Sequence, residues 1–116
     1  DNLSGNELWC QSKFDKYPYG IKFITKKRAE IYSYSDEDLI SIKVKYQTKP
    51  KAIYINGKYQ GAEIDGEIDR ESLISNITGS INGVGTDFCE LSSGVKIKIN
   101  YLYKENVKKL KKNKKL

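Results

Sequence analysis

Four alternating carboxylates form the pattern in this sequence with the clearest potential for chemistry. Glu63, Asp65, Glu67 and Asp69 are separated by single apolar or small residues, so a continuous strand would place all four on one face. Such a row offers oxygen ligands for Ca²⁺, or two carboxyl groups for glycoside hydrolysis. A turn at Asp65-Gly66 would scatter the row. The pattern is more typical of a solvated strand face, which is the interpretation we favour.

The residue types that are missing exclude most other chemistry. The sequence contains no histidine, no methionine and only two cysteines. Histidine bases, Ser-His-Asp and Cys-His nucleophiles and histidine metal sites are therefore ruled out. We predict no catalytic residue, no metal and no cofactor, and we do not expect an enzyme.

The two cysteines predict a disulfide bond. Cys10 ends the first apolar run and Cys89 lies in the last apolar run of the body. A bridge between them closes a loop of about 80 residues, which the chain-entropy estimate makes worth about 4.5 kcal/mol. Two buried free thiols in a cytosolic domain are the alternative. A disulfide, together with a start at Asp1 that suggests a removed secretory signal, predicts a periplasmic or secreted protein.

The net positive charge of the chain comes entirely from its C-terminal end. Residues 1–103 carry 14 basic and 14 acidic side chains, whereas residues 104–116 carry seven lysines and only Glu105. We expect this tail to contact an anionic surface or polymer, and a purely solubilising tail is the alternative. The predicted contact residues are Lys104, Lys108, Lys109, Lys111, Lys112, Lys114 and Lys115.

Two other classes of partner are not expected. Only two of the 21 basic residues are arginines, and sequence-specific reading of nucleic acid depends on the planar fork of arginine. No apolar run approaches the roughly eighteen residues that a transmembrane helix requires. The sequence does not predict an oligomeric state.

Tyrosines recur at a spacing of two. If these segments are extended, each pair shares one strand face and could stack on sugar rings or unpaired bases. Tyrosine is also common in half-buried strands, which is the reading we favour. The pairs are Tyr17 with Tyr19, Tyr32 with Tyr34, and Tyr101 with Tyr103.

Alternation of apolar and polar residues predicts that strands position these groups. The clearest strand covers residues 40–47, and residues 20–25 and 27–34 give two more. Short strands with tight turns and only two prolines suggest an antiparallel meander closed into a small barrel or sandwich. We predict a single β domain over residues 1–99 and a lysine-rich helix or tail over residues 100–116.

An Asn-Gly pair and an Asp-Gly pair mark two of the predicted turns. Asn56-Gly57 is expected to form a type I′ turn between residues 52–55 and 58–60, with Tyr54 facing Tyr59 across the hairpin. Asp65-Gly66 is a second candidate turn. Residues 68–75 predict a polar turn between two apolar positions, and the glycine-rich residues 76–86 predict a loop.

The segment before the tail fits two periodicities. Val95, Ile97 and Ile99 alternate with lysine as in a strand, whereas Ile99 also begins a helical stripe that continues through Leu102. We predict a helix from about residue 100 to residue 113, preceded by an extended segment.

Five features of the sequence occur together: the opening Leu3-Ser4-Gly5-Asn6-Glu7-Leu8-Trp9-Cys10, the segments 19–23 and 68–73, Cys89 and the lysine-rich end. In this combination the chain resembles small, signal-bearing, uncharacterised proteins of marine bacteria. This resemblance implies an export signal and no known activity. The layout also looks calycin-like, an up-and-down barrel with a cysteine in its first and last strands. Bacterial inhibitors of C-type lysozyme share it, with similar surroundings of Cys10 and Cys89. Their Ser-Gly-x-Arg-Tyr stretch is absent here, so this resemblance implies the architecture alone.

These observations predict an exported, non-enzymatic β-domain that binds or assembles through its cationic tail. A small-ligand carrier, or a protein of the lysozyme-inhibitor type, is the alternative. A wide interior cavity lined by tyrosines would favour the carrier.

Overall fold

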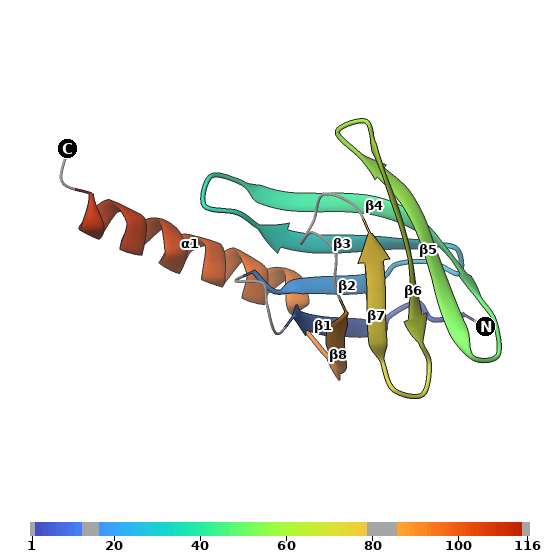
Figure 1. Ribbon diagram of the computed structural model, residues 1–116. Coiled ribbons are helices and arrows are strands. Elements are labelled where there is room, and N and C mark those ends of the chain that lie inside the picture. The colour runs from blue at the N-terminus through green and yellow to red at the C-terminus, as the bar shows by residue number, and fades with distance from the viewer. Residues whose placement is uncertain (1, 13–16, 79–85, 115–116) are drawn as a thin grey trace.

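The described residues, 2–12, 17–78 and 86–114, form eight antiparallel strands and one helix (Figure 1). The structure is a computed structural model, and its strands pair in chain order to form a closed barrel. The predicted fold class, a mainly β protein with a small antiparallel meander barrel or sandwich and a basic C-terminal helix, is confirmed, and the structure is the barrel. The elements are β1 Glu7–Ser12, β2 Tyr19–Phe23, β3 Arg28–Tyr34, β4 Leu39–Thr48, β5 Ala52–Tyr59, β6 Ala62–Asp69, β7 Ile74–Thr78, β8 Asp87–Ser92 and α1 Val95–Asn113.

Strand β1 closes the barrel because it pairs with both β2 and β8. Cys10 on β1 lies directly opposite Cys89 on β8, and the two side chains form a disulfide bond. The predicted bridge is therefore confirmed. It joins the first and last strands at the seam of the barrel.

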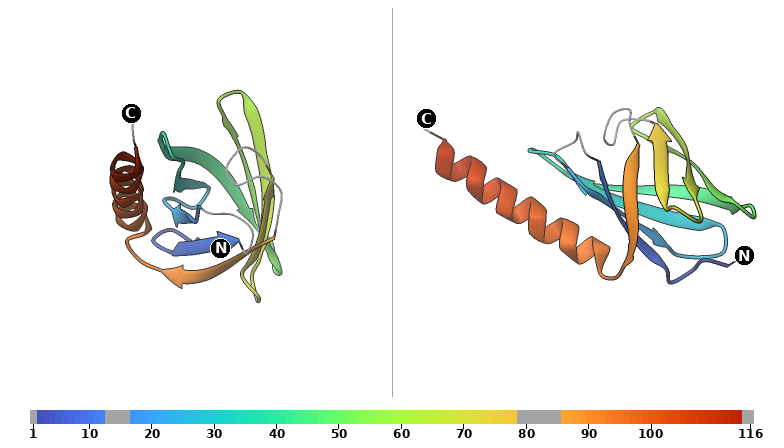
Figure 2. Two further views of the ribbon diagram at one scale, coloured as in Figure 1. Left: turned by 60° about the vertical axis from the view of Figure 1, so that its left-hand side comes forward. Right: turned by 60° about the horizontal axis from the view of Figure 1, so that its bottom comes forward.

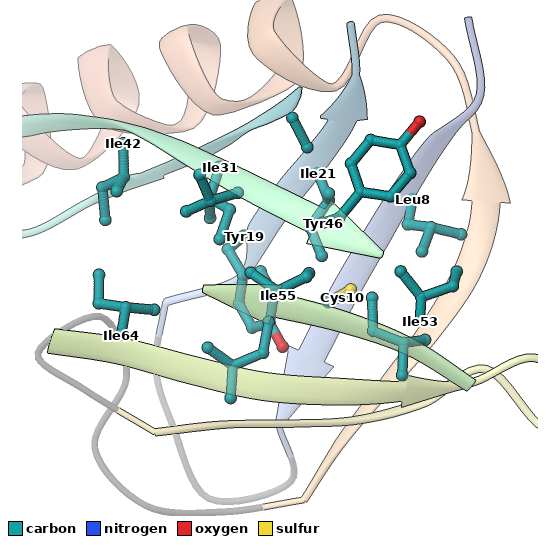
Figure 3. Packing of buried hydrophobic residues seen from close by; sticks show 14 of the residues in the cluster. Leu8, Cys10, Tyr19, Ile21, Ile31, Ile42, Tyr46, Ile53, Ile55 and Ile64 are labelled. Atoms are coloured by element: carbon teal, nitrogen blue, oxygen red, sulfur yellow. The ribbon is translucent and has the colours of Figure 1, made fainter. Parts of the chain in front are cut away.

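The interior of the barrel is filled by apolar side chains that alternate along the strands. On β4 the inward residues from Ile40 to Tyr46 are buried and their neighbours are exposed. Each such side chain contributes roughly 1.5–3 kcal/mol relative to exposure. The core comprises Leu8, Cys10, Tyr19, Ile21, Phe23, Ala29, Ile31, Ile40, Ile42, Val44, Tyr46, Ile53, Ile55, Ile64, Ile68 and Ile77 (Figure 3).

The predicted turn at Asn56-Gly57 is wrong, because β5 runs straight through it. Gly57 lies opposite Val44, and a Cβ placed on Gly57 would lie only 2.7 Å from Cγ1 of Val44. Glycine is needed here for the close approach of β4 and β5 rather than for a turn. The chain reverses instead at Gln60 and Gly61, with φ angles of 51° and 82°, so Tyr54 and Tyr59 do not face each other.

Asp65-Gly66 is likewise part of a strand and not a turn. A Cβ on Gly66 would lie 2.5 Å from the carbonyl oxygen of Asn76 on β7. The glycine lets β6 and β7 approach closely at this position. Both mispredicted turns therefore reflect backbone packing within the sheet.

The predicted turn within residues 68–75 is confirmed. The Asp69 carboxylate accepts hydrogen bonds from the backbone N–H groups of Glu71 and Ser72, at 2.9 and 2.8 Å. The chain then enters β7 at Ile74. Residues 76–78, predicted to belong to a loop, are instead the last residues of β7, since they pair with β6. Residues 79–85 of that predicted loop lie outside the described residues.

Helix α1 begins at Val95, so the predicted extended segment over residues 95–99 is wrong. Gly94 has a left-handed φ of 65° and turns the chain from β8 into the helix. Val95 and Ile99, four residues apart, are both buried, whereas Ile97 is 75% exposed. The alternation with lysine fits a strand, but burial follows the helical spacing because β3 already offers an apolar outer face.

Candidate functional site

Helix α1 docks on the outer face of β1, β2 and β3. Val95 and Ile99 pack against Tyr32 and Tyr34, which project outward from β3 and are buried by the helix. Further contacts come from Trp9, Tyr17, Leu102 and Tyr103 at the border of this cluster. A second, smaller core therefore lies between helix and barrel.

A glycine makes room for the start of the helix. Gly20 on β2 lies between Trp9 on β1 and Tyr32 on β3. A Cβ on Gly20 would lie 2.5 Å from Cβ of Val95. The outer face of the sheet thus has a depression, bordered by two large aromatic residues, into which the first turn of α1 fits.

The carboxylate of Glu7 caps the N-terminus of α1. Its oxygens accept hydrogen bonds from the backbone N–H groups of Gly94 and Val95, at 3.3 and 3.2 Å. The N-cap residue is a glycine and has no side chain to do this. A negative charge at this end also interacts favourably with the helix dipole.

The turn between β3 and β4 holds the middle of the helix. The Tyr103 hydroxyl donates to the backbone oxygen of Glu37 at 3.0 Å, and the Asn106 amide donates to the carboxylate of Asp36 at 2.9 Å. Tyr17 also donates its hydroxyl to Asp36. These contacts extend the attached part of α1 from Val95 to Asn106, which is about 17 Å of helix.

Beyond Asn106 the helix leaves the barrel and projects away from it (Figure 2). The molecule is consequently elongated, with principal extents of 53 × 27 × 24 Å. The predicted lysines Lys104, Lys108, Lys109, Lys111, Lys112 and Lys114 are all exposed on α1 or at its end, and Lys115 lies outside the described residues.

Two of the exposed lysines share an outward stripe with Ile97 and Tyr101. Ile97 and Tyr101 are 75% and 62% exposed, and Lys104 and Lys108 follow them at helical spacing on the same face. Lys108 also pairs with Glu105 at 3.4 Å. Within the described part of the chain, no helix is long and apolar enough to cross a membrane.

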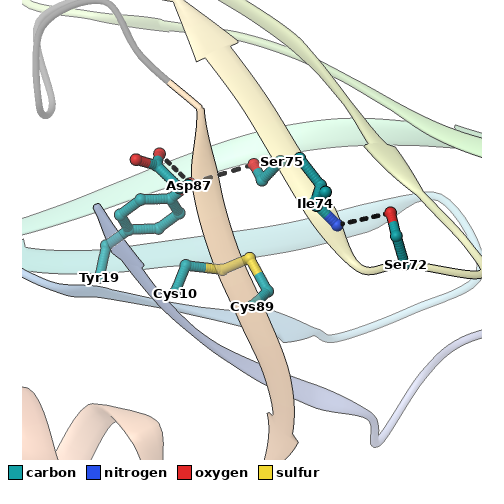
Figure 4. The surroundings of a disulfide bond; sticks show 7 residues. All are labelled: Cys10, Tyr19, Ser72, Ile74, Ser75, Asp87 and Cys89. Carbon is teal, nitrogen blue, oxygen red and sulfur yellow. Dashed lines mark hydrogen bonds between the residues drawn. A yellow bond between two sulfur atoms is a disulfide. The ribbon is translucent and has the colours of Figure 1, made fainter. Parts of the chain in front are cut away.

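A polar cluster inside the barrel was not predicted. The Tyr19 hydroxyl donates to the Asp87 carboxylate at 2.6 Å and lies 3.0 Å from the hydroxyl of Ser75, beside the disulfide (Figure 4). Burial, followed by the neighbouring carboxylate, raises the pKa of Tyr19 well above its usual range. The phenol therefore stays protonated and satisfies a buried carboxylate. Period-two patterning gives no signal for such a pairing between distant residues.

The four carboxylates do form a row, because β6 is continuous. All four are exposed on the outer face of the barrel, and Asp65 accepts a hydrogen bond from Asn56. The backbone N–H groups of Ser72 and Glu71 lower the pKa of Asp69, opposite to the raised value that a general acid needs. Among the described residues, no group of three carboxylates or cysteines could hold a metal ion.

The tyrosine pairs do not form an open platform. Tyr32 and Tyr34 share a strand face, but α1 covers it. Tyr19 points into the barrel whereas Tyr17 packs beside the helix. The third pair, at positions 101 and 103, is helical.

No family model, curated protein or solved structure matches this chain. The candidate site therefore rests on its own geometry. Two residues that build it, Glu7 and Gly20, were not predicted as functional. Their positions on β1 and β2 follow from alternation, but their contacts with Gly94 and Val95 depend on where the helix docks.

Proposed function

We propose that this protein is an exported, non-enzymatic binding or assembly module that contacts anionic surfaces or polymers through helix α1. The observation that carries the proposal is the two-part helix, which is attached to the barrel up to Asn106 and projects freely beyond it with its lysines exposed. The barrel acts as a rigid support. The helix is the contact element.

Electrostatic attraction accounts for most of the expected binding. Near an acidic membrane each lysine contributes about 1 kcal/mol. Because α1 is already helical and attached, less conformational entropy is lost on binding than for a flexible tail. Ile97 and Tyr101 add modest apolar area on the same stripe, so the interaction should weaken strongly with salt.

The disulfide supports export, because such bonds persist in oxidising compartments and are rare in the cytosol. The absence of histidine from the sequence and the buried hydrogen bond from Tyr19 to Asp87 support a non-enzymatic role. The alternative of a small-ligand carrier gains no support, since apolar side chains fill the barrel interior.

Binding to anionic vesicles tests the proposal. The full chain is sedimented with phosphatidylglycerol-containing vesicles, or passed over a heparin-like matrix, at low salt. Replacing Lys108, Lys111 and Lys112 by glutamine should reduce retention by at least about tenfold, since each charge contributes about 1 kcal/mol.

The matched control replaces three exposed barrel lysines, Lys43, Lys51 and Lys58, and so has the same net charge. This variant should be retained almost as well as the wild type. Equal losses in the two variants, or unchanged retention of the helix variant, would contradict a specific role for α1.

A further inference from the structure

A second group of cations surrounds a hollow at the other end of the barrel. Lys26 and Lys27 come from the turn between β2 and β3, and Lys45 and Lys49 from the end of β4 and the residue after it. The hollow has a volume of about 410 Å³. The β2–β3 turn and the end of β4, which carry these lysines, lie at the right-hand end of the barrel in Figure 1, whereas the free end of α1 lies at the left.

The backbone holds these lysines together. The N–H of Tyr46 donates to the carbonyl of Lys27 at 2.9 Å, and the Tyr46 hydroxyl donates to the carbonyl of Thr25. The Tyr46 ring also packs edge-on against Phe23, with centroids 4.9 Å apart. The β2–β3 turn is thereby fixed against β4, so the convergence of the lysine backbones is a property of the fold.

The positive charge at this hollow is not neutralised. No carboxylate lines it, and within the described residues none of its four lysines forms an ion pair within 4.0 Å. Arg28 on β3 lies directly opposite Lys45 on β4. Like charges at opposite cross-strand positions are destabilising, so an anion bound at Lys45 would relieve part of a cost that the free protein bears.

We propose that this hollow binds a short chain of phosphate groups. Its volume falls within the roughly 300–1,000 Å³ that is usual for small-molecule sites, which exceeds the needs of a single phosphate. Lysine binds phosphate as a point charge without fixed geometry, so charge density should decide affinity. The aromatic ring at the hollow, Tyr46, is only 3% exposed, and there is no open platform for a sugar or base among the lining residues.

The site does not depend on the proposed role of α1, because the two lie at opposite ends of an elongated molecule. A protein with both sites is bivalent for anions. It could join an anionic surface at one end to a phosphate chain at the other.

Calorimetric titration of the full chain with orthophosphate, pyrophosphate and tripolyphosphate at low salt tests the proposal. Affinity should rise with each added phosphate. The variant K45Q/K49Q should bind tripolyphosphate at least about tenfold more weakly, since two charge-assisted contacts are lost. The control K43Q/K51Q has the same net charge as K45Q/K49Q, and each replaced lysine lies two residues from the one it is compared with. It should change the affinity for tripolyphosphate less than about twofold.

Two further readouts keep the outcome clear. Without ligand, K45Q should leave the melting temperature unchanged or raise it, because the repulsion by Arg28 is removed. Amide chemical shifts on adding tripolyphosphate should change at residues 24–28 and 45–49. Equal weakening of tripolyphosphate binding in both variants would overturn the proposal. Chemical-shift changes confined to residues 104–114 would also overturn it, but would leave the proposed role of α1 intact.

Discussion

Gly20 and Val95 are in direct contact across the interface between barrel and helix, although 75 positions separate them in the sequence. A Cβ on Gly20 would lie 2.5 Å from Cβ of Val95 and 2.8 Å from its Cγ2 atom. Non-bonded carbon atoms do not approach each other this closely, so the glycine sets how closely α1 can approach β2. The direction in which the cationic end projects depends on this contact.

Replacing Gly20 by alanine should therefore displace the first turn of α1. We expect a loss of about 1–3 kcal/mol in the free energy of unfolding, as for other overpacked sites, even though alanine normally suits a strand better than glycine. Chemical denaturation measures the loss. The fluorescence of Trp9, which borders the interface, reports the displacement.

The double variant with Val95→Ala provides the internal check. The nearest atom to the added methyl group is Cβ of Val95, which alanine retains, so this second change should not restore stability. A Gly20→Ala protein as stable as the wild type would disprove the close contact.

The cap by Glu7 gives a second prediction. Glu7→Ala removes the acceptor for the N–H groups of Gly94 and Val95 and should cost about 0.5–2 kcal/mol, the usual value of an N-cap. Glu7→Gln keeps an acceptor and should cost less. Hydrogen exchange at these two amides measures the effect directly.

Glu90 offers the matched control, because it is an exposed carboxylate on the neighbouring strand β8. Glu90→Ala should leave the exchange rates of the first helical turn unchanged. The same acceleration in both variants would show that general loss of negative charge, and not capping, is responsible.

The disulfide should contribute a large part of the stability. Cys10 and Cys89 are separated by 79 positions, and a loop of this length corresponds to about 4.5 kcal/mol in the chain-entropy model. The double variant C10S/C89S, or the reduced protein, should unfold at a much lower denaturant concentration. A midpoint that reduction does not move would mean that the seam between β1 and β8 is held by other contacts alone.

Asp69 predicts a specific pH dependence. The backbone N–H groups of Ser72 and Glu71 lower its pKa in the folded state. The carboxylate therefore stabilises the fold above its unfolded pKa of about 3.9, and this contribution disappears as the pH falls through the lowered folded value. The melting temperatures of wild type and Asp69→Asn, measured from pH 7 to pH 2, should differ at neutral pH and converge in acid. A constant difference would contradict this assignment.

Alternation predicted the barrel because its inner face is mostly apolar. The β4 residues Ile40, Ile42 and Val44 illustrate this, since burial alone decides their direction. Asn56-Gly57 misled the prediction because its turn propensity is local, whereas the approach of Val44 is a tertiary effect. The close contact with Val44 therefore decides that Asn56-Gly57 forms part of β5.

The helix start and the basic hollow could not be derived from periodicity. Val95 and Ile99 fit a strand or a helix equally well, and only the outward tyrosine face of β3, which the helix buries, favours the helix. Lys26 and Lys45 belong to a body with no net charge, and they become neighbours through the fixed β2–β3 turn. The charge of the tail, in contrast, is local in sequence and was predictable.

Amide chemical shifts of the full chain, recorded with small anionic bicelles and with zwitterionic ones at low salt, test the central claim most directly. Binding through α1 predicts that anionic bicelles shift the resonances of residues 104–114 and leave those of β5 and β6 in place, and that zwitterionic bicelles shift neither. Shifts centred on the barrel strands, or no response of α1 to the anionic bicelles, would contradict the account.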